Sequence, residues 1–131
     1  MKVFLGGTCN GSDWREKVIE KLDIDYFNPI TAHWNKAAQL NEFKEKENAD
    51  FLLFVLTPLM EGAYSIAEVV DASNKKPEKT ILCILDTDGE REWTKHQKDS
   101  LRAIEDLVRA NGGHISSSIE ETIDILNSNQ Y

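Results

Sequence analysis

One carboxylate is distinguished by the small and apolar residues around it. Glu68 lies in the segment TPLMEGAYSIAEVV, about one turn into a predicted helix. A carboxylate that faces a sheet must be oriented by hydrogen bonds, and such a group is suited to nucleophilic or acid–base chemistry. On position alone, a solvated residue stabilised by the helix dipole is the favoured interpretation.

A glycine-containing loop is the second feature that could bind a ligand. The segment GGTCNGSDW begins with Gly6 and Gly7, which let a ligand approach the backbone closely, and it precedes a predicted helix N-terminus. A phosphate, hydroxyl or carboxylate group would suit this place. The loop lacks the lysine and the spacing of a Walker loop, and a tight turn is the alternative interpretation.

The histidines and cysteines show no spacing that indicates a metal site or a catalytic triad. His33 and His114 have no partner at such a spacing, and His96 falls on the polar face of a predicted helix. Cys9 and Cys83 have no paired spacing and fit a reducing compartment. We therefore expect no metal, no cofactor and a cytoplasmic location.

Composition and charge limit the classes of partner. The chain has 131 residues, of which 40% are hydrophobic, so we assign residues 1–131 to one domain with its own core. The net charge of -8 would repel a nucleic acid backbone, and a small ligand is expected instead. No stretch approaches the roughly 18 to 20 apolar residues of a membrane span, and the N-terminal apolar run is too short for a signal peptide.

Alternating strands and helices must position these residues. Six consecutive apolar residues follow Asp50 and predict a central strand that is buried on both faces. Amphipathic spacing predicts the helices, with Trp14 in the core and with Leu40 and Phe43 facing inward. The predicted strands are 2–5, 25–28, 51–56, 79–85 and 114–115, and the predicted helices are 14–22, 37–48, 65–73, 94–110 and 118–126.

This order of elements predicts an α/β fold with a parallel sheet and right-handed crossovers. We expect a single-domain, flavodoxin-like (Rossmann-like) three-layer sandwich with a five-stranded parallel sheet. In open sheets of this kind, ligands bind beyond the carboxyl ends of the strands. That rule selects the loops 6–12, 28–35 and 57–65 for a binding site.

The motifs in these loops resemble those of the nucleoside 2-deoxyribosyltransferase family and of its relatives that hydrolyse deoxynucleoside monophosphates. The resemblance covers about residues 2–85 and rests on VFLGGT, NADFLLFVLTP and GAYSIAEVVDAS, which precede a turn with Lys and Pro and the strand TILCIL. In that family, a strand that begins with Asp leads to a Gly-containing loop and then to a helix with a nucleophilic Glu. The resemblance therefore implies that Glu68 is the nucleophile.

The resemblance also implies further site residues. Family members carry an acidic residue about two helical turns before the Asp that opens the central strand, which gives Glu42 here. The proton for the leaving base would come from Glu42, from Asp50 or from a neighbouring subunit, although Glu42 also fits a solvated helix surface. Glu61 would repel a phosphate and favours nucleosides over nucleotides, although Ser65 or Thr8 could compensate and bind a phosphate. The expected substrate-binding residues are Gly6, Gly7, Thr8, Asn28, Trp34, Gly62, Tyr64 and Ser65.

The implied activity is cleavage of the N-glycosidic bond of a (deoxy)nucleoside or nucleotide. A covalent glycosyl-glutamate would form through an oxocarbenium-like transition state and then transfer the sugar to another base or to water. The expected partners are the small-molecule substrate and further copies of the chain in a homo-oligomer, a dimer or larger. Two alternatives are a non-catalytic protein that binds or senses a nucleotide-like ligand and a glycohydrolase that acts on another ribosyl substrate.

Overall fold

Five parallel strands form the central sheet of the computed structural model, which describes residues 1–9, 11–30 and 35–128. The strand order is β2-β1-β3-β4-β7, and each neighbouring pair is parallel. This arrangement confirms the predicted flavodoxin-like sheet. The strands are β1 (Lys2–Gly7), β2 (Asp25–Phe27), β3 (Phe51–Leu56), β4 (Thr80–Ile84) and β7 (His114–Ser116).

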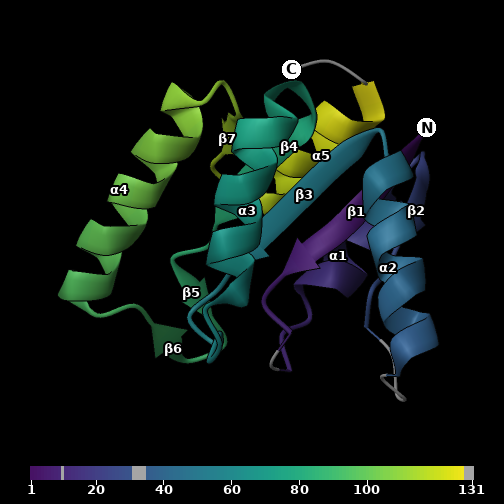
Figure 1. Ribbon diagram of the computed structural model, residues 1–131. Helices are drawn as coiled ribbons and strands as arrows, with labels where there is room; N and C mark the ends of the chain where they lie inside the picture. The colour runs from purple at the N-terminus through teal and green to yellow at the C-terminus, as the bar shows by residue number, and fades with distance from the viewer. Residues whose placement is uncertain (10, 31–34, 129–131) are drawn as a thin grey trace.

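Helices cover both faces of the sheet and give three layers (Figure 1). One face carries α1 (Trp14–Lys21) and α5 (Ile119–Ser128). The other carries α2 (Lys36–Asn48), α3 (Tyr64–Lys75) and α4 (Lys95–Ala110). A short 3₁₀ helix, η1 (Pro77–Lys79), precedes β4, and an antiparallel pair, β5 (Thr87–Asp88) and β6 (Arg91–Glu92), lies in the predicted polar connection.

Alternating side chains of the central strands build two cores. Leu53 and Val55 belong to the cluster that also holds Trp14, whereas Leu52 and Phe54 belong to the cluster that also holds Val69. Every residue of β3 is buried because helices cover both faces of a parallel sheet. Trp14, which is only 1% exposed, is confirmed as a core residue.

The predicted inward positions of α2 are wrong. Leu40 and Phe43 are each 62% exposed, and no described residue of this helix is buried. The side of α2 that faces the rest of the molecule carries Glu42 and Lys46, which line a cavity instead of a dry core. Leu40 and Phe43 are therefore left largely exposed, with Phe43 at the wall of the cavity.

Strand β1 extends two residues further than predicted and includes both glycines. A Cβ atom on Gly6 would lie 2.7 Å from the Phe54 ring, and one on Gly7 would lie 2.2 Å from the carbonyl oxygen of Val55. Gly7 also has a φ of 114°, which side chains of L-residues rarely adopt. The two glycines are thus required for close approach of β1 to β3.

Within the described part of the chain, none of the helices combines the length and the apolarity that a membrane crossing requires.

Candidate functional site

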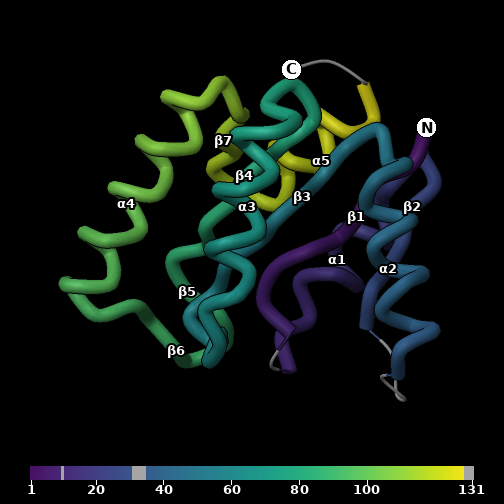
Figure 2. Tube along the Cα trace, in the orientation of Figure 1, coloured from purple at the N-terminus to yellow at the C-terminus, as the bar shows by residue number. Residues whose placement is uncertain are grey.

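The candidate site lies where β1 and β3 end. Figure 2 shows that the turns that leave these two strands emerge at the same end of the sheet. A cavity of about 610 Å³ opens there, which is a usual size for a small-molecule site. Its walls come from the end of β1, from α2, and from the loop before α3 with the first turns of α3. Among the predicted residues, the cavity brings together Gly6, Gly7, Thr8, Glu42, Gly62, Tyr64, Ser65 and Glu68.

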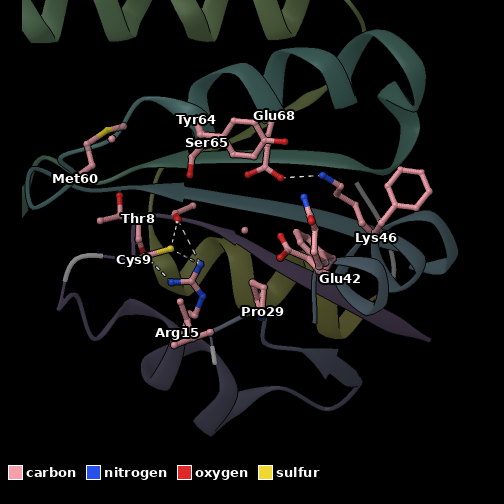
Figure 3. Close-up of a pocket in the computed structure, with 17 residues that line it drawn as sticks. Thr8, Cys9, Arg15, Pro29, Glu42, Lys46, Met60, Tyr64, Ser65 and Glu68 are labelled. Carbon is pink, nitrogen blue, oxygen red and sulfur yellow. Dashed lines mark hydrogen bonds and ion pairs between the residues drawn. The ribbon is translucent and has the colours of Figure 1, made fainter. Parts of the chain in front are cut away.

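Glu68 points into this cavity from the first turns of α3 (Figure 3). Its side chain is only 9% exposed, so it is not the solvated residue that position alone favoured. The ammonium group of Lys46 donates a hydrogen bond to Glu68 Oε2 at 2.8 Å. No hydrogen bond is recorded to the other carboxylate oxygen, Oε1, among the described residues.

Lys46 is a site residue that the sequence analysis missed. Its Nζ atom lies 5.8 Å from the centre of the Phe4 ring, in addition to its contact with Glu68. Burial alone would lower the pKa of Lys46, but the hydrogen bond and the negative charge of Glu68 outweigh it and raise that pKa. Lys46 therefore stays charged. Its spacing of four residues from Glu42, on the same side of a helix, was the available signal.

Glu42 faces the same cavity from α2, across from Glu68 (Figure 3). Burial raises the pKa of Glu42, and the negative charge of Glu68 raises it further, whereas Lys46 and Arg15 oppose this change. A carboxyl group whose pKa is raised holds its proton closer to neutral pH, so Glu42 is suited to donate a proton. Glu68, with one oxygen hydrogen-bonded to Lys46, is placed to act as a nucleophile.

Arg15 forms the base of the cavity and was also missed. It is 4% exposed, and its guanidinium donates hydrogen bonds to the carbonyl oxygens of Leu5, Gly7 and Thr8. No carboxylate pairs with it within the described residues, and burial lowers its pKa. Arg15 thus fixes the end of β1 and adds positive potential beneath the cavity. Its position in a charged helical segment, beside Trp14, resembled ordinary helix surface.

Thr8 connects the two loops that form the cavity. It is 2% exposed, and its hydroxyl oxygen accepts a hydrogen bond from the backbone N–H of Thr57 at 2.9 Å. Its backbone N–H donates to the carbonyl oxygen of Val55. Within the part of the chain that the structure describes, the Thr8 hydroxyl group accepts this hydrogen bond and donates none.

Some predicted residues lie elsewhere. Asp50 is exposed, precedes β3 at the opposite end of the sheet, and accepts a hydrogen bond from the backbone N–H of Lys2. Asn28 is exposed and accepts from the backbone N–H of Ile30, so it shapes the turn and does not line the cavity. Trp34 lies outside the described residues, as does His33.

The described residues contain no group of three or more His, Cys, Asp or Glu side chains that could hold a metal ion. Cys9 lies at the cavity as a free thiol beside Arg15, and Cys83 is buried in the sheet.

Comparison with models of known protein families identifies a match. A family model described as "Nucleoside 2-deoxyribosyltransferase like" matches residues 1–87, which include the whole set of cavity residues named above. No curated protein and no solved structure shows a significant match to the chain.

Proposed function

The chain belongs to the nucleoside 2-deoxyribosyltransferase-like family, and we propose from this premise that it cleaves the N-glycosidic bond of a nucleoside or nucleotide through a covalent glycosyl-Glu68. The observation that carries the proposal is the Glu68 carboxylate, which is nearly buried in a cavity and which Lys46 contacts at Oε2. A carboxylate so placed can stabilise an oxocarbenium-like transition state and then capture it.

In the first half-reaction, Glu68 Oε1 attacks C1′ of the bound sugar. The bond from C1′ to the base nitrogen breaks, and its electron pair leaves with the base. Glu42 lies across the cavity from Glu68 and donates the proton that the departing base needs, a role that the upward shift of its pKa favours.

In the second half-reaction, water or a second base attacks C1′ and the electron pair of the ester C1′–O bond returns to Glu68. Glu42, now a carboxylate, accepts the proton of the attacking group. Water gives hydrolysis and a base gives transfer, so both outcomes share the same residues. Asp50 has no part in this proposal because it lies at the opposite end of the sheet.

Several cavity residues are proposed to bind the substrate. Thr8 and Ser65 offer hydroxyl groups at one end of the cavity, and Tyr64 forms part of the rim beside them. Glu61 is exposed and does not line the cavity, so the sequence-based reason to prefer nucleosides over nucleotides finds no support in its position. The proposed substrate class therefore includes both.

We also propose that the protein is a homo-oligomer. Large apolar side chains are exposed around the cavity mouth: Ile30, Phe43 and Tyr64 line the cavity, and Leu40 lies one turn before Phe43 on α2. A second copy of the chain would remove these side chains from water.

Chromatography of the products from a panel of nucleosides, 5′-nucleotides and dinucleotides tests the proposed activity. We expect free base from a nucleoside or nucleotide, and a loss of about 10³-fold or more in kcat for Glu68→Gln. Asp71→Asn, an exposed acidic residue on the same helix, is the matched control and should keep wild-type activity. Ligand binding without any release of base would instead identify a non-catalytic sensor.

A further inference from the structure

We propose that Lys46 is a positioning residue that shortens the lifetime of the glycosyl-enzyme by stabilising Glu68 as the departing carboxylate. This inference rests on the proposed function and assigns a role to the second half-reaction. It concerns how long the covalent intermediate persists before water or a second base removes the sugar.

The contact between the two side chains is specific to one oxygen. Lys46 Nζ lies 2.8 Å from Glu68 Oε2, and no partner is recorded for Oε1 among the described residues. The Lys46 side chain is 26% exposed and the Glu68 side chain 9% exposed, so water screens this pair only partly. Lys46 thus orients the carboxylate and leaves Oε1 free for C1′.

The proton on Lys46 is retained. The pKa of Lys46 is raised by Glu68 despite burial, which makes the ammonium a poor proton donor to a leaving base. Glu42, four residues earlier on the same helix, has the raised carboxyl pKa that suits proton donation. The two residues of α2 therefore have different roles, because Lys46 keeps its proton and Glu42 transfers one.

The charge on Glu68 changes twice in a catalytic cycle. When Oε1 bonds to C1′, the carboxylate becomes a neutral ester, and Lys46 loses its anionic partner. When the C1′–O bond breaks, the electron pair returns to Glu68, and the full ion pair with Lys46 forms again. A fixed cation therefore favours the free carboxylate over the ester. Its removal should stabilise the ester and slow its breakdown.

The test compares kinetics and intact mass of variants at this position. Lys46→Met removes the charge and keeps most of the side-chain length, Lys46→Gln keeps a hydrogen-bond donor without charge, and Lys46→Arg keeps the charge. Lys44→Met, an exposed lysine on the same helix, is the matched control. The assay measures kcat and KM for base release. It also measures the fraction of protein that carries a covalent sugar when the reaction is quenched at steady state.

For Lys46→Met and Lys46→Gln, we expect kcat to fall roughly 10-fold or more, the usual size of a charged hydrogen bond. KM should fall in parallel, because slow breakdown lets the intermediate accumulate, so kcat/KM changes little. The covalent fraction should rise well above that of the wild type. Lys46→Arg should restore most of kcat, and Lys44→Met should resemble the wild type.

A different pattern overturns the inference. If Lys46→Met and Lys46→Gln lower kcat/KM without accumulation of a covalent sugar, Lys46 acts before or during the first half-reaction or only supports the fold. This result would leave the proposed function intact, since the wild type would still release base. A wild-type protein that releases no base from any of the panel contradicts the proposed function, and the inference falls with it.

Discussion

At the scale of single residues, two glutamates in one cavity have different surroundings. Glu68 has a cation at hydrogen-bond distance, whereas Glu42 has burial and a neighbouring negative charge, which both raise its pKa. Different surroundings of this kind let one site supply a nucleophile and an acid from the same residue type. Both residues are glutamates, so their roles as nucleophile and proton donor are assigned from their surroundings.

The role of Glu42 as proton donor predicts a dependence on the leaving base. Glu42→Gln should lower kcat by about 10² to 10⁴-fold for an ordinary base, the usual contribution of general acid catalysis. The loss should be much smaller for a 2′-deoxynucleoside with an N7-methylated guanine, which carries a positive charge and can leave without a proton. Rates of base release for both substrates check this prediction. An equal loss for both substrates would show that Glu42 does not donate the proton.

The same substitution also has a predicted effect on stability. Because the pKa of Glu42 is raised in the folded protein, the folded state binds more protons than the unfolded state between the ordinary and the raised pKa. Wild-type stability should therefore fall as the pH rises through this interval. Gln has no proton to lose, so Glu42→Gln lacks this pH dependence. The difference in Tm, variant minus wild type, should therefore increase as the pH rises through this interval and then stay constant. Thermal melts at a series of pH values measure the difference.

The sequence could indicate Glu68 and Glu42, because family motifs mark both positions. It could not indicate Lys46 and Arg15. Charged residues within a helix usually lie on the solvent side, and only the packing of α1 and α2 against the end of the sheet turns these two towards the cavity. The sequence also offered Asp50 as one possible proton donor, but Asp50 precedes β3 and lies at the opposite end of the sheet from the cavity.

At the scale of elements, the buried strands were predictable because continuous apolar runs are typical of a covered parallel sheet. The role of Gly6 and Gly7 at the end of β1 was less predictable. They looked like a ligand loop, yet the structure uses them for close contact with Phe54 and Val55, and they line the cavity as a consequence. The inward face of α2 was mispredicted because a helix that covers a cavity does not need an apolar inner side.

Gly7 packs against β3, whereas Gly62 lines the cavity without such a contact, so alanine substitutions at the two positions should affect stability differently. Gly7→Ala should lower the free energy of unfolding by about 1 to 3 kcal/mol from backbone strain alone, with a further loss from the contact with Val55. Gly62→Ala should change it by less than about 0.5 kcal/mol, because among the described residues none beyond its two chain neighbours has an atom within 4 Å of the new methyl group. Urea denaturation measures both. Similar values for the two variants would contradict the proposed role of Gly7.

At the scale of the whole molecule, the parts that build the site lie within the matched residues 1–87, and the rest completes the fold. Strand β7 extends the same sheet beside β4, and Leu126 of α5 packs in the core that holds Trp14. This continuity supports the proposal that residues 1–131 act as one catalytic domain.

The proposed homo-oligomer predicts a specific sensitivity to charge on α2. Leu40→Glu should shift the protein to a smaller species, because it places a charge among the exposed apolar side chains beside the cavity. Leu107→Glu is the matched control, since Leu107 is an exposed leucine on α4, away from the cavity. Size-exclusion chromatography with light scattering gives the mass of each. A monomeric wild type at assay concentration would contradict the proposed assembly.

The central claim is that Glu68 becomes covalently bonded to the sugar. A 2-fluoro-2-deoxy nucleoside analogue slows breakdown of such an intermediate, so incubation with it, proteolysis and mass spectrometry test the claim directly. We predict an added fluorosugar on the peptide that contains Glu68, and none on that peptide from Glu68→Gln. An active wild-type enzyme that carries no adduct, or carries it on another residue, would contradict the account.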